Sequence, residues 1–229
     1  MANDAYFTKA TFGFLKELAA NNNRPWFEKN KPRYEDHVKE PAMRFITEFR
    51  PCLKKISPHF RADPRPVGGS MFRIYRDTRF SKDKSPYKTF TGIQFRHELG
   101  KDAHAPGFYL HLEPGSAFIG LGCWHPDSGS VRSIRDAIIE DSAGWKRAAH
   151  GKKFTARFGL EGESLSRHPR GVDPEHPLID DLKRKDFIGV AHVSQKMITA
   201  RGFLEEFTDA CKDGKGLMQF LCKAVGAPF

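Results

Sequence analysis

The chain has 229 residues, of which 39% are hydrophobic and 12% aromatic, and this composition excludes a disordered protein and predicts a packed globular one. Its 38 basic and 28 acidic residues give a net charge of +10, which favours an anionic partner such as a phosphorylated metabolite or nucleic acid. No stretch approaches the roughly 20 apolar residues of a membrane span or resembles a signal peptide, so we expect no membrane association. The four cysteines form no closely spaced pair, which predicts reduced thiols in a cytoplasmic protein whose oligomeric state stays open.

Helices are predicted over the first 56 residues. Apolar side chains recur there at helical spacing: Phe7, Phe14, Leu15 and Leu18. Thr8 is placed to cap the first helix, and the asparagines at 21–23 should end it. Pro25 suits the first turn of a second helix, and Pro32 predicts a restart. Two further prolines, Pro41 and Pro51, should kink or divide the apolar stripe that continues to Ile56.

The period of the hydrophobic pattern changes to two between about residues 67 and 123, which predicts a mostly antiparallel sheet. The expected strands are Met71–Tyr75, Ile93–Phe95, Phe108–Leu112 and Ala117–Gly122, with a tight turn at Pro114-Gly115 joining the last two. One face is apolar. The other would carry polar side chains: Arg73, Tyr75, Gln94, Arg96, Tyr109, His111 and Glu113. That polar face either lines a cleft or is an ordinary solvated surface.

The remainder of the chain is predicted to be largely helical. A helix should begin near Gly129-Ser130, and residues 159–174 should form a long loop. We expect a short helix over Pro174–Phe187, a short strand over Ile188–Val193, and a cap at Ser194 before the C-terminal helices. The whole chain, residues 1–229, is therefore predicted to be a single α+β domain in which N-terminal and C-terminal helices flank the segment that forms the sheet.

Common catalytic and cofactor signatures are absent from the sequence, including the phosphate loop, the nucleophile elbow and the zinc-protease motif. No cofactor is therefore expected. His111 and Glu113 have the spacing of two metal ligands on one strand, but no defined set of further ligands accompanies them, so no metal is predicted either. Asp77 or Glu113 could act as a general base and His111 as an acid–base group, or each could be the partner of an ion pair.

The segment Met71–Lys88 is rich in charge, with a net charge of +4 between residues 73 and 88. Six cations face two carboxylates between residues 73 and 88, and arginine suits phosphate or carboxylate ligands because its planar fork donates two hydrogen bonds. Five of these cations, one tyrosine of the segment and two residues from neighbouring strands are the candidate ligand-binding residues: Arg73, Tyr75, Arg76, Arg79, Lys82, Lys88, Arg96 and Tyr109. Alternatively, Asp77 and Asp83 neutralise a solvated loop.

The run Phe72–Lys88 resembles the hallmark of domain-of-unknown-function family 2461. The resemblance extends to Phe14–Leu18, Asn22–Phe27, Gly120–Pro126 and Pro169–Gly171, so it spans nearly the whole chain. It implies a single α+β domain and marks where to look for a site, but it implies no reaction.

Three functional hypotheses follow. In the first, the protein binds an anionic small molecule between the polar sheet face and the cationic loop, with or without catalysing a reaction. In the second, the same basic surface binds nucleic acid non-specifically. In the third, the arginines pair internally with Asp77, Asp83 and Glu113, and the domain is structural or binds a protein partner.

Overall fold

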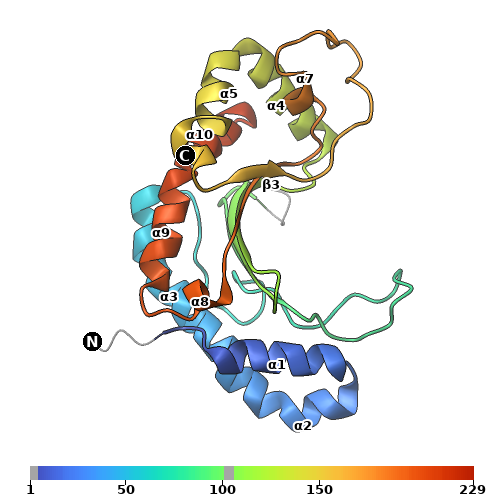
Figure 1. Ribbon diagram of the computed structural model, residues 1–229, viewed down its shortest axis with the longest axis vertical. Helices are drawn as coiled ribbons and strands as arrows, with labels where there is room; N and C mark the ends of the chain where they lie inside the picture. Colours follow the sequence, from blue (N-terminus) through green and yellow to red (C-terminus); the bar gives the residue numbers. More distant parts are fainter. Residues whose placement is uncertain (1–4, 101–105) are drawn as a thin grey trace.

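The computed structural model describes residues 5–100 and 106–229, and it confirms an α+β fold (Figure 1). A five-stranded antiparallel sheet has the order β1-β2-β3-β5-β4. Its strands are β1 (Thr91–Arg96), β2 (Gly107–Leu112), β3 (Phe118–Cys123), β4 (Gly159–Glu161) and β5 (Phe187–His192). The helices are α1 (Lys9–Ala20), α2 (Arg24–Tyr34), the π-helical turn η1 (Glu35–Lys39), α3 (Glu40–Ile56), α4 (Ser128–Glu140), α5 (Ser142–Ala149), α6 (Lys152–Thr155), α7 (Ile179–Leu182), α8 (Gln195–Ile198), α9 (Phe203–Asp213) and α10 (Lys215–Ala224).

The N-terminal helices begin where the capping residues predict. The Thr8 hydroxyl accepts a hydrogen bond from the backbone N–H of Ala10 at the start of α1. The Asn23 side chain accepts one from the N–H of Trp26, and Pro25 lies in the first turn of α2. Both caps satisfy donors that a helix leaves free at its N-terminus. The predicted cap at Thr8 and the predicted place of Pro25 in the first turn of a second helix are confirmed, whereas the cap at Asn23 was not predicted.

The predicted restart at Pro32 is wrong. Pro32 lies inside α2, and the chain runs on through the π-helical turn at Glu35–Lys39 into α3, where Pro41 occupies the first turn. Pro51 also lies within α3 and does not divide it. A proline removes one backbone hydrogen bond, and here the buried apolar stripe of α3 holds the helix together despite that loss.

The two faces of the sheet differ. One is covered by α3 and α9, whose Phe49 and Phe207 pack against Phe95 of β1 with ring centroids 4.7 and 5.8 Å away. The other face is concave and lies open between the loop of residues 76–86 and the loop that follows β4 (Figure 1). The β2–β3 hairpin with its Pro114-Gly115 turn is confirmed, and Gly115 adopts a φ of 81° there.

The segment Met71–Tyr75 is not a strand, contrary to prediction. It makes only isolated bridges, from Met71 to Ile93 and from Tyr75 to Tyr87. Because one end pairs with β1 and the other with residues 86–88, its hydrogen bonds do not build a continuous ladder. Phe72 and Ile74 also do not share a face, since Ile74 is buried in the core while Phe72 lines the concave side. Beyond this segment, residues 76–86 form a projecting loop that we call the basic arm (Figure 1).

The C-terminal half supplies two strands of the sheet. The strand predicted at residues 188–193 is observed as β5, but it lies between β3 and β4, within the sheet and beyond the predicted boundary at residue 123. The helix predicted over Pro174–Phe187 is reduced to α7, and Phe187 already belongs to β5. The predicted loop at 159–174 begins with β4. The Ser194 cap before α8 is confirmed by its bond from the N–H of Met197.

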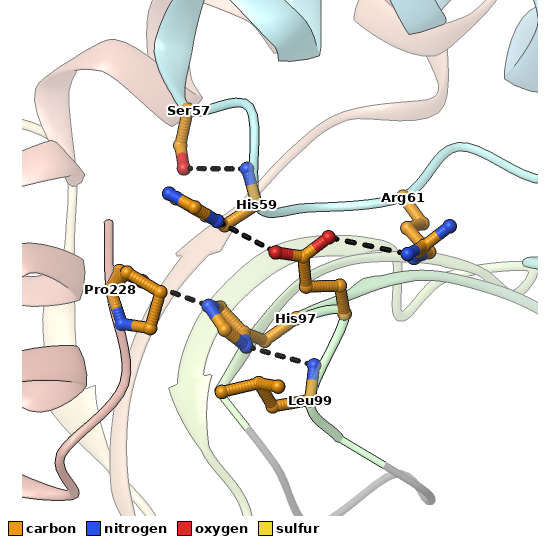
Figure 2. Close-up of polar contacts among 7 residues, drawn as sticks. Ser57, His59, Arg61, His97, Leu99 and Pro228 are labelled. Carbon is orange, nitrogen blue, oxygen red and sulfur yellow. Dashed lines mark hydrogen bonds and ion pairs between the residues drawn. The ribbon is translucent and has the colours of Figure 1, made fainter.

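The C-terminal residues are tied to the end of β1 (Figure 2). The buried His97 ring donates from Nε2 to the carbonyl of Pro228 at 2.8 Å, and its Nδ1 accepts from the N–H of Leu99 at 3.1 Å. Beside it, the Glu98 carboxylate meets His59 at 2.7 Å and Arg61 at 3.2 Å (Figure 2). Within the described residues, no helix is long and apolar enough to cross a membrane.

Candidate functional site

A cleft of about 800 Å³ occupies the concave face of the sheet. Its floor comes from β1, β2, β3 and β5, which place alternate side chains on this face. Five aromatic residues line it: Phe72, Phe90, Tyr109, Phe118 and Trp124. Besides Tyr109, its titratable groups are Lys88, His111, Glu161 and His192. The cleft therefore combines apolar, aromatic walls with a small number of polar groups, as ligand sites commonly do.

Three side chains of β2 and its C-terminal end form a hydrogen-bonded chain on the cleft floor. The Tyr109 hydroxyl lies 3.0 Å from Nδ1 of His111, and Nε2 of His111 lies 3.1 Å from Oε2 of Glu113. The alternation of the strand puts all three on one face, as the sequence predicted. Gly92, opposite His111 in β1, makes room for the phenol, because a Cβ there would lie 2.5 Å from the Tyr109 oxygen. We call this chain the Tyr109–His111–Glu113 relay.

The His111 ring is enclosed by aromatic rings. It stacks on Phe118 with centroids 4.6 Å apart and lies 4.6 Å from Phe90, and only 8% of the residue is exposed. Burial lowers the pKa of His111, and Glu113 opposes that change only in part. Burial also raises the pKa of Tyr109, with a smaller contribution from Glu113. The relay is therefore a neutral phenol and a neutral imidazole next to a carboxylate.

The depressed pKa of His111 predicts a pH-dependent loss of stability. The unfolded chain, with a His pKa near 6.5, binds this proton more readily than the native state, so the stability from burying neutral His111 is complete above that pH and is lost as pH falls. Between about pH 7.5 and about pH 5, wild type should lose more free energy of unfolding than His111→Gln, measured by urea denaturation. An equal loss in His111→Gln would contradict the prediction.

Lys88 enters the cleft wall from the segment before β1. Its ammonium donates to the Arg73 carbonyl at 2.7 Å and lies 5.7 Å from the centre of the Phe72 ring. Burial, and to a smaller extent the charge of Arg73, lower the pKa of Lys88. Among the described residues no carboxylate lies within 4.0 Å of this ammonium. Lys88 also lines a second hollow of about 600 Å³, between α1 and the basic arm, so it stands between the two cavities.

The basic arm is held together by ion pairs of its own. Arg76 pairs with Asp83, and Arg79 donates two hydrogen bonds to Asp77, at 3.0 and 2.7 Å. These bonds, chiefly from the Arg79 side chain, lower the pKa of Asp77 to about 2, and Ser85 and Arg76 lower that of Asp83. Two of the arginines predicted to bind ligand thus already have carboxylate partners two and seven residues away.

The structure divides the predicted site residues between several places. Lys88, Tyr109 and His111 meet in the cleft, with Glu113 behind His111. Arg76 and Asp77 line the second hollow. The other predicted ligand-binding residues are not among those that line the cleft: Arg73, Tyr75, Arg79, Lys82 and Arg96. Arg96 donates to the Gly69 carbonyl at 3.2 Å, and Tyr75 packs against Tyr87. The basic arm and the polar sheet face therefore do not converge on one cavity.

Several cleft residues were not anticipated from the sequence. Glu161 and His192 come from β4 and β5 and pair at 3.0 Å, and Trp124 lies just beyond β3. The alternation of Ile188, Val190 and His192 in the predicted strand was the available signal, but it gave no strand order. Phe72 also lines the cleft, although strand alternation over Met71–Tyr75 predicts it on the apolar face.

A buried carboxylate fixes the end of the cleft near Trp124. Asp186 is 1% exposed and accepts hydrogen bonds from the backbone N–H of His125 at 2.6 Å and of Glu163 at 2.8 Å. His125 has a φ of 47°, a left-handed conformation that is uncommon outside glycine, and its ring nitrogen Nδ1 lies 3.1 Å from the same carboxylate. Asp186 thus joins the segments after β3 and β4, next to cleft residues Trp124 and Gly162.

In the part of the chain that the structure describes, no three His, Cys, Asp or Glu side chains are placed together to hold a metal ion. A family model described as "Conserved hypothetical protein (DUF2461)" matches residues 10–220, and the chain belongs to this family. No curated protein and no solved structure matches the chain. The function must therefore be inferred from the site itself.

Proposed function

We propose that this member of the DUF2461 family binds a small organic anion with a planar, apolar body in the cleft on the concave face of the sheet. The volume of about 800 Å³ lies in the usual range for small-molecule sites. Aromatic walls favour a planar ligand because rings stack with an offset or meet edge to face. The ligand would carry a carboxylate, phosphate or similar group.

The observation that carries the proposal is the environment of Lys88. A lysine ammonium is strongly hydrated, so its partial burial beside Phe72 has a cost that a carbonyl acceptor offsets only in part. An anion in the cleft would supply the missing counter-charge and satisfy the remaining ammonium donors. Lys88 rather than the arginines is the expected counter-ion, because Arg76 and Arg79 are engaged by Asp83 and Asp77.

Binding of 2-naphthoate and of neutral 2-naphthamide tests this proposal. We expect 2-naphthoate to raise the melting temperature more than the amide does, because only the carboxylate gains a charge-assisted bond from Lys88. Lys88→Met keeps much of the aliphatic stem, and we expect it to weaken naphthoate binding about tenfold to about a hundredfold, which corresponds to about 1.5–3 kcal/mol. Isothermal titration calorimetry would measure the change.

Lys82→Met is the matched control, since Lys82 is exposed on the basic arm and does not line the cleft. It removes the same charge from the chain and should leave naphthoate binding close to that of wild type. Equal weakening by both substitutions would show that net charge, not the cleft, attracts the anion. Equal binding of naphthoate and naphthamide would also contradict the proposal.

Non-specific nucleic-acid binding is the second candidate, favoured by the exposed cations Arg73 and Lys82 beside an open concave face. This function predicts an affinity for single-stranded DNA that falls steeply as the salt concentration rises. In that case Lys82→Met would weaken DNA binding as much as Lys88→Met. The free cysteines Cys52, Cys123, Cys211 and Cys222 fit a reducing compartment such as the cytoplasm for either function.

A further inference from the structure

The hydrogen-bond order in the Tyr109–His111–Glu113 relay can be deduced from its chemistry. An ionised Glu113 only accepts, so Nε2 of His111 must carry the proton between them. A neutral imidazole then has a bare Nδ1, which accepts the Tyr109 O–H at 3.0 Å. In this arrangement the lone pairs of the Tyr109 oxygen are left to accept a hydrogen bond from a molecule in the cleft. The order matches that of a nucleophile or acid, its base, and the carboxylate that orients the base.

We infer that the Tyr109–His111–Glu113 relay is an acid–base device that removes a proton from the molecule bound in the cleft. The Tyr109 oxygen accepts the proton of a bound X–H group while its own proton passes to Nδ1 of His111. The X–H bond breaks with its electron pair left on X, the phenol is regenerated, and His111 becomes an imidazolium paired with Glu113. No oxidant or other reactant is needed, and the reverse step returns the proton.

The charges around the relay favour removal of the proton. Lys88 lines the same cleft and would stabilise the anion X⁻ as it forms. Glu113 stabilises the imidazolium, whereas burial between Phe90 and Phe118 keeps His111 neutral until it receives the proton. Beyond Phe118 the cleft holds Glu161 and His192, which pair with each other. The inference rests on the proposed function, because it requires a molecule in the cleft, and it extends that function from binding to proton transfer.

The substrate class that follows is a planar aromatic acid with an ionisable X–H group, and 4-nitrophenol is a suitable probe. Its ionisation near neutral pH changes its visible absorbance. We expect the pKa of the bound probe to be lower than that of the free probe by about one unit or more, which is a tenfold or larger shift in its ionisation equilibrium. The proton should appear on His111, which ¹⁵N-edited NMR spectra would register as an imidazolium in the complex.

Two substitutions separate the relay from simple attraction to Lys88. Tyr109→Phe keeps the ring but removes the oxygen, and it should return the pKa of the bound probe most of the way to the free value. Glu113→Gln can still accept from Nε2 but cannot neutralise an imidazolium, so it should also reduce the shift. The matched control is His59→Gln, which breaks another His–carboxylate pair outside the cleft and should leave the shift intact (Figure 2).

The outcomes distinguish this inference from the proposed function. If neither 2-naphthoate nor 4-nitrophenol binds, both are wrong. If naphthoate binds but 4-nitrophenol fails to bind, binds with an unshifted pKa, or keeps its shift in Tyr109→Phe, the cleft binds anions and the relay moves no proton. A shift that is lost in Tyr109→Phe and retained in His59→Gln supports the relay.

Discussion

Replacing Phe45 by alanine is expected to lower the free energy of unfolding by about 3–5 kcal/mol, the usual cost of deleting a fully buried phenylalanine. Phe45 is completely buried in α3. Five aromatic rings lie with centroids between 5.4 and 6.1 Å from its own: Tyr6, Phe7, Phe49, Phe203 and Phe207. They come from the N-terminal segment, from α3 itself and from α9, so the cavity would open where these elements meet. Denaturation by urea, monitored by circular dichroism, measures the loss.

Phe80→Ala is the control for this experiment. Phe80 is 94% exposed on the basic arm, and its removal should change stability by about 0.5 kcal/mol or less. The interpretation of Phe45 would be wrong if both substitutions had similar effects. If Phe45→Ala does not fold, Phe45→Leu provides a milder test, with a smaller loss expected because most of the apolar volume is kept.

Asp186→Ala is expected to cost about 3 kcal/mol, because it removes a buried carboxylate and leaves two part-buried backbone N–H groups, those of His125 and Glu163, without their acceptor. The left-handed conformation of His125 would also lose the contact that holds it. Since these segments carry Trp124 and Gly162 into the cleft, binding of 2-naphthoate should weaken as well. Chemical denaturation and calorimetric titration give the two readouts.

Asp127 offers the matched comparison. It also accepts two backbone N–H bonds, from Gly129 and Ser130, but it does so as an exposed N-cap of α4. Water can replace an exposed acceptor, so Asp127→Ala should cost about 1 kcal/mol and leave naphthoate binding unchanged. A loss in Asp186→Ala no larger than in Asp127→Ala would show that Asp186 does not brace the end of the cleft.

The sequence predicted the site unevenly, and the reason is the range of the interactions involved. Strand alternation is a local pattern, so the sequence predicts that Tyr109, His111 and Glu113 share one polar face. In the structure these three side chains are hydrogen-bonded in series. The basic arm is rich in cations, yet Arg76 and Arg79 are engaged by acids of the same arm. Charge composition indicates where cations concentrate, but it does not reveal which of them already have partners.

Residues that are distant in sequence were beyond prediction. His192 and Glu161 line the cleft because β5 and β4 join the sheet beside β3, and no local pattern specifies that order. The same limit explains Phe72: an alternating run of apolar and polar residues predicts a strand, but whether its hydrogen bonds form a ladder depends on which segments lie beside it.

By itself, the sequence determined the α+β class, the capped N-terminal helices, the β2–β3 hairpin and the polar face of β2, because each depends on periodicity or on a cap within a few residues. The tertiary structure alone decided that this face lines a cleft, that Lys88 joins it while the arginines stay outside, and that Asp186 braces its end. Those features depend on contacts between segments far apart in the chain, such as the 61 residues that separate His125 from Asp186. The cleft exists because of the strand order, and the strand order depends on how the whole core packs.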